Sequence, residues 1–376
     1  MPTISPSLPS PQAVIFDMDG VLIDVSSSYR AVIARTCEIY LTTVLNLRLP
    51  KKADLISAAD ISALKLVGGF NNDWDATAGL LTCLLASLVP VTRPLLPLAI
   101  PFDISISRLC QALQNYTAQF SPGNLADQPE LRLGPLLEAA QGWAHQHKRG
   151  GFEALSQVLD AQSWAKVQVL LCNKGDLHHT NIVERIFQEL YLGPRRFQAS
   201  YNATPIFYRE DGYIERETLI INPQTLARLQ ERGVKLGVAT GRPGSEARYS
   251  LDFFQLNSYF QAVVTDDERS LAESSAGQKL GKPHPFVLLE AARQLDLDPG
   301  GPPIYYLGDV PDDVLAANRA KATMPAFRSV GLLSALPYDP VLRGPAAQTL
   351  RMAFERNAAD YILEHPDQIA YSIWFT

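Results

Sequence analysis

The sequence has little cysteine, little histidine and no marked excess of charge. Its four cysteines are far apart, at Cys37, Cys83, Cys110 and Cys172. This spacing excludes the cysteine pairs of structural zinc sites and redox motifs, and it is typical of reduced residues in a cytoplasmic protein. The net charge of −6 excludes a strongly basic surface, so nucleic acid is not an expected partner.

Long apolar segments are scarce as well. Residues 76–92 carry no charged side chain, but Gly79 and Pro90 interrupt the stretch. A transmembrane helix needs about 17–25 apolar residues, so the stretch is at the lower limit of that range. We interpret it as a buried helix of a globular domain. A membrane is therefore not an expected partner, and the sequence leaves the oligomeric state open.

The second half of the chain alternates short apolar runs with helical patterns. That order predicts a Rossmann-like α/β fold, in which a parallel sheet is flanked by helices. The expected strands are residues 234–239, 262–264, 304–307, 326–330 and 360–363, and the clearest helices are residues 223–231 and 285–295.

One further strand is expected far upstream, at Ala13–Phe16, where every residue is apolar. The long region after it is rich in Leu, Ala and Gln and has helical periodicity. The simplest interpretation is an all-α domain inserted after the first strand. We expect residues 1–24 and 217–376 to form the α/β domain, and residues 25–216 to form the inserted helical domain.

Two aspartates follow the first strand at once, in the phrase Asp17-Met18-Asp19-Gly20. Alternate residues of an extended chain point to the same side, so Asp17 and Asp19 are expected to face one site. Gly20 allows the chain to turn directly afterwards. Buried carboxylates that lie close together repel each other unless a cation compensates them, and Mg²⁺ is a cation that prefers such oxygen ligands.

Three further segments follow expected strands, where open α/β sheets bind their ligands. Thr240, with Gly241 beside it, offers a hydroxyl and a backbone N–H to an anion, although a helix cap is the simpler explanation for this threonine alone. Lys282 lies in a loop whose two prolines predict an extended chain that directs the lysine towards a phosphate. A solvated surface lysine is the alternative.

The last segment is residues 308–313, Gly-Asp-Val-Pro-Asp-Asp. Capping of the following helix accounts well for Asp312 and in part for Asp313. It accounts poorly for Asp309, which lies at the strand end behind a glycine that permits close approach.

In this order, each after a strand, the four segments resemble the motifs of the haloacid dehalogenase superfamily. Those motifs are a DxDGxL/V strand end, a Thr or Ser, a Lys, and a GDxxxD. The match covers residues 12–25 and about 218–330. The helical insertion resembles the type-C1 caps of the phosphatase-like subfamily I, although it is longer than those caps usually are.

The resemblance implies a role for each aspartate. Asp17 would be the nucleophile that forms an aspartyl-phosphate, and Asp19 would be the general acid and base. The implied ligands of Mg²⁺ are Asp17, Asp19 through its backbone carbonyl, Asp309 and Asp313. An acid at Asp19 favours phosphoryl transfer, because the dehalogenating members of the superfamily lack both this acid and the metal.

The resemblance also implies contacts with the substrate. Thr240 and Lys282 would act in catalysis by holding the phosphoryl oxygens. Gly241 and Arg242 are further candidate substrate contacts, and a surface ion pair explains Arg242 equally well.

In the insertion, Asn71 and Asn72 are the candidate contacts with the substrate, and a helix cap is the simpler alternative for both. The resulting hypothesis is a Mg²⁺-dependent hydrolase of a small phosphorylated metabolite. One alternative is a phosphomutase that returns the phosphoryl group from the same aspartyl-phosphate to a sugar phosphate. A catalytically silent binding protein of the same fold is the other.

Overall fold

The structure is a computed structural model that describes residues 8–49, 55–70, 72–88, 104–118, 133–334 and 340–374. The chain divides into two compact units. Unit 1 contains Met1–Val25 and Glu217–Thr376, and unit 2 contains Ser26–Arg216. Among the described residues all strands lie in unit 1, and unit 2 is helical.

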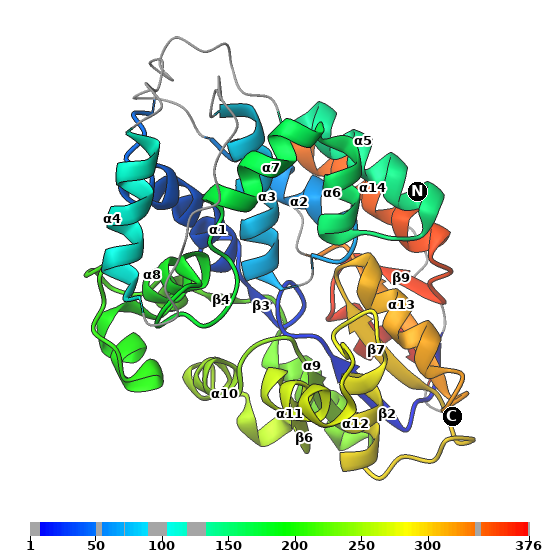
Figure 1. The fold of residues 1–376 in the computed structure, drawn as a ribbon. Helices are drawn as coiled ribbons and strands as arrows, with labels where there is room; N and C mark the ends of the chain where they lie inside the picture. The colour runs from blue at the N-terminus through cyan, green and yellow to red at the C-terminus, as the bar shows by residue number, and fades with distance from the viewer. Residues whose placement is uncertain are drawn as a thin grey trace. The chain divides into compact units, whose positions relative to one another are not determined.

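The main sheet of unit 1 has six parallel strands in the order β6-β5-β2-β7-β8-β9. These are β2 (Ala13–Phe16), β5 (Lys235–Ala239), β6 (Ala262–Val264), β7 (Ile304–Gly308), β8 (Phe327–Leu332) and β9 (Tyr361–Leu363). The blue strand β2 therefore lies between β5 and β7, two strands from the second half of the chain (Figure 1). The chain first adds β5 and β6 on one side of β2 and then β7, β8 and β9 on the other. Ligands of open α/β sheets bind at such a switch point.

Helices cover this sheet as the alternation of patterns predicts. They are α9 (Pro223–Glu231), α10 (Gly244–Phe253), α11 (Asp266–Ala276), α12 (Phe286–Gln294), α13 (Pro311–Ala320), α14 (Pro340–Arg356) and α15 (Gln368–Ser372). All four residues of β2 are buried, because a parallel strand is covered on both faces. Helices α12 and α13 pack on the face that carries Ala13 and Ile15. The predicted fold class is confirmed.

Two short strand pairs complete unit 1. β1 (Leu8–Pro9) pairs in parallel with β10 (Ile373–Trp374). β3 (Ile23–Asp24) pairs antiparallel with β4 (Thr218–Leu219). The second pair ties together the segments just before and just after unit 2, so the chain leaves and re-enters unit 1 at one place.

Unit 2 is built from α1 (Tyr29–Ile39), the π-helix η1 (Tyr40–Val44), α2 (Ala58–Lys65), α3 (Asp73–Leu88), α4 (Ile106–Thr117), α5 (Gly134–His147), α6 (Gly151–Val158), α7 (Ala161–Leu170), α8 (Ile182–Tyr201) and the 3₁₀ helix η3 (Tyr213–Arg216). Helix α3 contains most of the uncharged stretch. Residues 76–85 are buried, and α3 packs against α1, α2, α6, α7 and α8. Within the described ranges, none of the helices combines the length and apolarity that crossing a bilayer requires.

Candidate active site

The ends of three neighbouring strands bring predicted site residues to one edge of the sheet. Strand β2 is in register with β5 on one side and β7 on the other. Asp17, Thr240 and Asp309 directly follow these strands, so they emerge at the same edge. The backbone N–H of Asp17 donates to the carbonyl of Leu307 at 2.9 Å, which continues the ladder one residue beyond β2.

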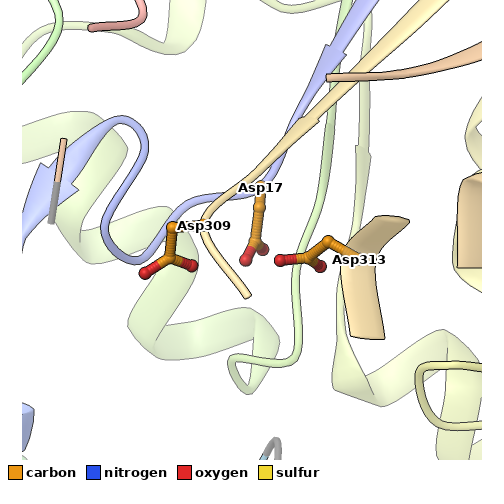
Figure 2. Close-up of side chains that lie close together, drawn as sticks. All are labelled: Asp17, Asp309 and Asp313. Carbon is orange, nitrogen blue, oxygen red and sulfur yellow. The ribbon is translucent and has the colours of Figure 1, made fainter. Parts of the chain in front are cut away.

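Three aspartates at this edge form a carboxylate cluster. Carboxylate oxygens of Asp17, Asp309 and Asp313 all lie within 4.8 Å of one another. Figure 2 shows the three side chains directed towards a common space, with Asp17 between the other two. Such oxygen donors can hold a divalent cation. The Asp19 carboxylate is not one of the three in the cluster. That the backbone carbonyl of Asp19 is a further metal ligand stays a prediction.

Lys282 reaches into the carboxylate cluster. Its Nζ lies 3.0 Å from Asp17 Oδ1 and 2.9 Å from Asp313 Oδ1. The side chain is 9% exposed, so the alternative of a solvated surface lysine is wrong. The loop itself turns instead of running extended, because the N–H of His284 donates to the carbonyl of Gly281 at 2.9 Å.

The charges of the site do not balance within the protein. Three carboxylates and one ammonium group, when all are ionised, leave a formal charge of −2. Burial raises the pKa of Asp17 to about 8; Asp313 and Asp309 act in the same direction, and Lys282 opposes them. Burial alone would lower the pKa of Lys282, but the charges of Asp17 and Asp313 outweigh it and raise that pKa. A divalent cation would balance the charge that remains.

Asp313 serves both the helix and the site. Its Oδ2 accepts the N–H of Val310 at 3.2 Å and caps α13, so the capping interpretation is also correct. Its Oδ1 accepts from Lys282 and, at 3.1 Å, from the hydroxyl of Tyr306. A role for Tyr306 was not predicted, because a tyrosine in an apolar strand resembles an ordinary core residue. Its spacing of two from Gly308, on the same face of β7, was the available signal.

The aspartate phrase itself turns where an extended chain was expected. Gly20 has a φ of +74°, and the chain folds back at this point. Asp17 faces Lys282, whereas Asp19 faces the guanidinium of Arg242. The two carboxylates are still near enough for the charge of Asp19 to contribute, as the smallest cause, to the raised pKa of Asp17.

Thr240 lies in a local turn. Its side chain is buried, and its hydroxyl accepts the backbone N–H of Arg242 at 3.1 Å. It is not the N-cap of α10, which is Pro243. Gly241 follows it in an open position, where an added Cβ would meet nothing within 4 Å. The phosphate contacts of Thr240 and Gly241 stay predictions.

Arg242 is a buried charged residue of the predicted set. Its Nε donates to Asp19 Oδ1 at 2.7 Å, and its Nη atoms donate to Glu217 at 3.0 and 3.1 Å and to the Ser250 hydroxyl at 2.9 Å. A surface ion pair is therefore the wrong description. Its role as a substrate contact stays a prediction. Glu217 and Ser250 were not predicted, because neither lies in a motif.

The candidate residues of the insertion have separate outcomes. Asn71 lies outside the described residues. Asn72 Oδ1 accepts the N–H of Trp74 at 2.7 Å and so caps α3, as the simpler alternative for Asn72 proposed. Its contact with a substrate stays a prediction.

A family model described as haloacid dehalogenase-like hydrolase matches residues 222–327. The matched range contains Thr240, Lys282, Asp309 and Asp313. Over these residues the chain is similar to haloacid dehalogenase-like hydrolases. Asp17 lies outside the matched range, but β2 brings it to the same edge of the sheet as Thr240 and Asp309.

Solved structures are similar to the chain over nearly its whole length. A Northeast Structural Genomics Consortium target has 20% identity and a TM-score of 0.56, over 95% of this chain and 97% of that chain. A predicted phosphoglycolate phosphatase from Haemophilus somnus has 14% identity and a TM-score of 0.42, over 96% and 97%. A subfamily IA hydrolase from Geobacter sulfurreducens has 16% identity and a TM-score of 0.37, over 97% and 98%. The likeness to the first of these structures, at 20% identity, shows the fold alone. No curated protein sequence matches the chain.

The close approach of α13 to β7 gives a first test of the structure of this site. A Cβ at Gly308 would lie 2.2 Å from the Cβ of Asp313, so Gly308→Ala should displace Asp313 and lower the free energy of unfolding by about 1–3 kcal/mol. Urea unfolding measures this loss. Gly241→Ala is the matched control, since its Cβ meets nothing within 4 Å. Equal stability of both variants would contradict the close packing at Gly308.

Proposed function

We propose that the protein is a Mg²⁺-dependent phosphatase that hydrolyses a small phosphorylated metabolite through an aspartyl-phosphate. The observation that carries this proposal is the setting of Asp17. Its carboxylate is buried at the end of the central strand, inside the carboxylate cluster and 3.0 Å from the ammonium of Lys282. A carboxylate placed between a cation and oxygen ligands of a metal can attack an anionic phosphate ester.

The reaction has two halves in this proposal. First, a carboxylate oxygen of Asp17 forms a bond to phosphorus, the ester P–O bond breaks, and Asp19 gives a proton to the leaving oxygen. A water molecule then forms a bond to phosphorus and gives a proton to Asp19, and the bond between phosphorus and Asp17 breaks. Inorganic phosphate leaves, and both aspartates return to their starting states.

Lys282 is the fixed cation of the site. Asp313 accepts from its ammonium group, and the ring of Tyr306 lies 5.3 Å from Nζ. Burial and the charge of Asp313 raise the pKa of Tyr306, which keeps its hydroxyl a donor to Asp313. A lysine held in this way would neutralise the phosphoryl oxygens with little reorganisation, and Thr240 would add a hydroxyl.

The residues present fit Mg²⁺. The candidate donors are all oxygens, which suit a hard cation, and the formal charge of −2 matches a divalent ion. Asp17, Asp309 and Asp313 would hold it, with the backbone carbonyl of Asp19. When bound, Mg²⁺ offsets the repulsion between the nucleophile and the anionic ester.

Asp17→Asn tests the nucleophile. The change is nearly isosteric, so the fold should persist, while release of phosphate should fall by on the order of 10⁶-fold, as it does when other enzymes lose a nucleophile. A screen of phosphorylated metabolites with Mg²⁺, followed by a phosphate assay, supplies the substrate for this measurement. Substantial activity in the variant would refute the assignment of Asp17.

The pH dependence of metal binding gives a second test. Because burial raises the pKa of Asp17 from 3.8 to about 8, the folded protein holds a proton in this window that the unfolded chain releases. Asp17 therefore lowers the free energy of unfolding as pH rises through the window. Mg²⁺ needs the ionised carboxylate, so the rise in Tm that it causes should be larger near pH ~8 than near pH ~6. Asp17→Asn is the control, and the dependence should vanish there. An equal rise in Tm at both pH values for the wild type would contradict the prediction.

A phosphomutase would use the same aspartyl-phosphate, and one assay separates the two activities. We expect free phosphate to form from a monophosphate and Mg²⁺ alone. Strict dependence on a bisphosphorylated activator, with no free phosphate, would establish the mutase instead. If no tested ester gives phosphate release or phosphoryl transfer, a binding protein is the better description.

A further inference from the structure

A buried arginine connects the general acid and base to the place where the chain re-enters unit 1. The side chain of Arg242 is 1% exposed, and that of Glu217, its partner, is also 1% exposed. Asp19, on the other side of the guanidinium, keeps 27% of its side chain exposed. Arg242 and Glu217 are therefore enclosed, and Asp19 is the member of this group whose side chain is partly exposed.

The contacts with Asp19 fall on a single oxygen. Nε of Arg242 donates to Asp19 Oδ1 at 2.7 Å, and Nη2 donates to the same oxygen. A carboxylate whose Oδ1 is fixed by two donors presents Oδ2 in one orientation. Oriented proton transfer depends on such placement, and a misplacement of about 1 Å can cost about 10²-fold in rate.

The guanidinium is itself held on its other edge. Glu217 accepts from both Nη atoms of Arg242, and the Ser250 hydroxyl accepts from Nη1 and donates to Glu217 Oε2 at 2.9 Å. A planar guanidinium with carboxylates on two edges has little freedom to rotate. Burial between two carboxylates also leaves Arg242 poorly placed to meet a phosphate from solution.

We propose that Arg242 is a positioning residue for Asp19: it fixes Oδ1 so that Oδ2 is the atom that exchanges protons with the leaving group and with water. This inference rests on the proposed function. Its largest effect should fall on the second half of the reaction. There water forms a bond to phosphorus, its proton goes to Oδ2, and the bond from phosphorus to Asp17 breaks.

The test uses para-nitrophenyl phosphate, whose leaving group departs as an anion and needs no proton. The first half then depends little on Asp19, so a defect in Asp19 appears in the second half. Removing Arg242 alone would leave the Glu217 carboxylate buried without its cation, which destabilises proteins strongly. The variant is therefore the double change Arg242→Met with Glu217→Gln, checked by circular dichroism and thermal unfolding.

A second buried pair supplies the matched control. In unit 2, Arg185 Nε lies 2.5 Å from Glu189 Oε1, and the two side chains are 4% and 0% exposed. Arg185→Met with Glu189→Gln removes a second buried arginine–glutamate pair, which lies outside the site described above. Arg242→Lys, which restores one charged donor, is the conservative variant.

Stopped-flow release of nitrophenolate with Mg²⁺ measures both halves. In the Arg242 double variant, a burst of about one nitrophenolate per protein should precede turnover, and the ratio of burst rate to steady-state rate should rise about 10-fold to 100-fold over wild type. The lysine variant should fall between the two, and the Arg185 control should keep the wild-type ratio. An unchanged ratio in the Arg242 variant would overturn the inference, since loss of general structure would slow both halves alike. Absence of any nitrophenolate or phosphate from wild type would instead overturn the proposed function.

Discussion

The ion pair between Lys282 and the aspartates at the end of the sheet is the interaction on which the rest of the site depends. A buried carboxylate is costly, and Asp17 has two more beside it, so the strand end could not be packed without a cation. Lys282 meets Asp17 and Asp313 at once and joins a loop, a strand end and the first turn of α13. The lysine therefore stabilises the arrangement but does not neutralise it.

This partial balance of charge fits the different roles that we propose for Asp17 and Asp19. They are separated by one residue, yet each has its own cation, Lys282 for Asp17 and Arg242 for Asp19. Asp17 lies among carboxylates with Lys282, where burial raises its pKa and a bound cation would favour its charged form. Asp19 lies with Arg242, at a partly exposed position suited to proton transfer. The separation of roles comes from partners that are distant in sequence, because the aspartates themselves are chemically identical.

The fold could be predicted largely from local pattern. Buried parallel strands are continuously apolar, so the runs at Ala13–Phe16 and Ala262–Val264 were found with their observed limits. The two-residue strands β3 and β4 could not be found, because so short a pairing has no periodicity. The turn after Asp17 was missed for a related reason, since alternation describes an extended chain and gives no sign of where it folds back.

Residues of the candidate site that lie in motifs could be predicted from the sequence. Residues outside the motifs that hold them in place by hydrogen bonds could not. Lys282, Asp309 and Asp313 are charged residues of recognisable motifs, so the sequence suggested a function for each. The structure corrects one detail: Lys282 lies in the loop after α11 and not directly after a strand. Tyr306 and Glu217 give no such sign, because a buried tyrosine and a lone glutamate are common in any domain. Only the folded chain shows that both hold a charged residue of the site in place.

Glu217 has a second property, which follows from its position in the chain. It is the first residue of unit 1 after the insertion, directly before the strand β4 that pairs with β3. The hydrogen-bonded group around Asp19 therefore includes the residue that directly follows the helical unit. An insertion of different sequence or length could replace unit 2 without disturbing that group only if the exchange left Glu217 and the β3–β4 pair in place. An engineered exchange of the helical unit should therefore join the chain on the helical side of Glu217.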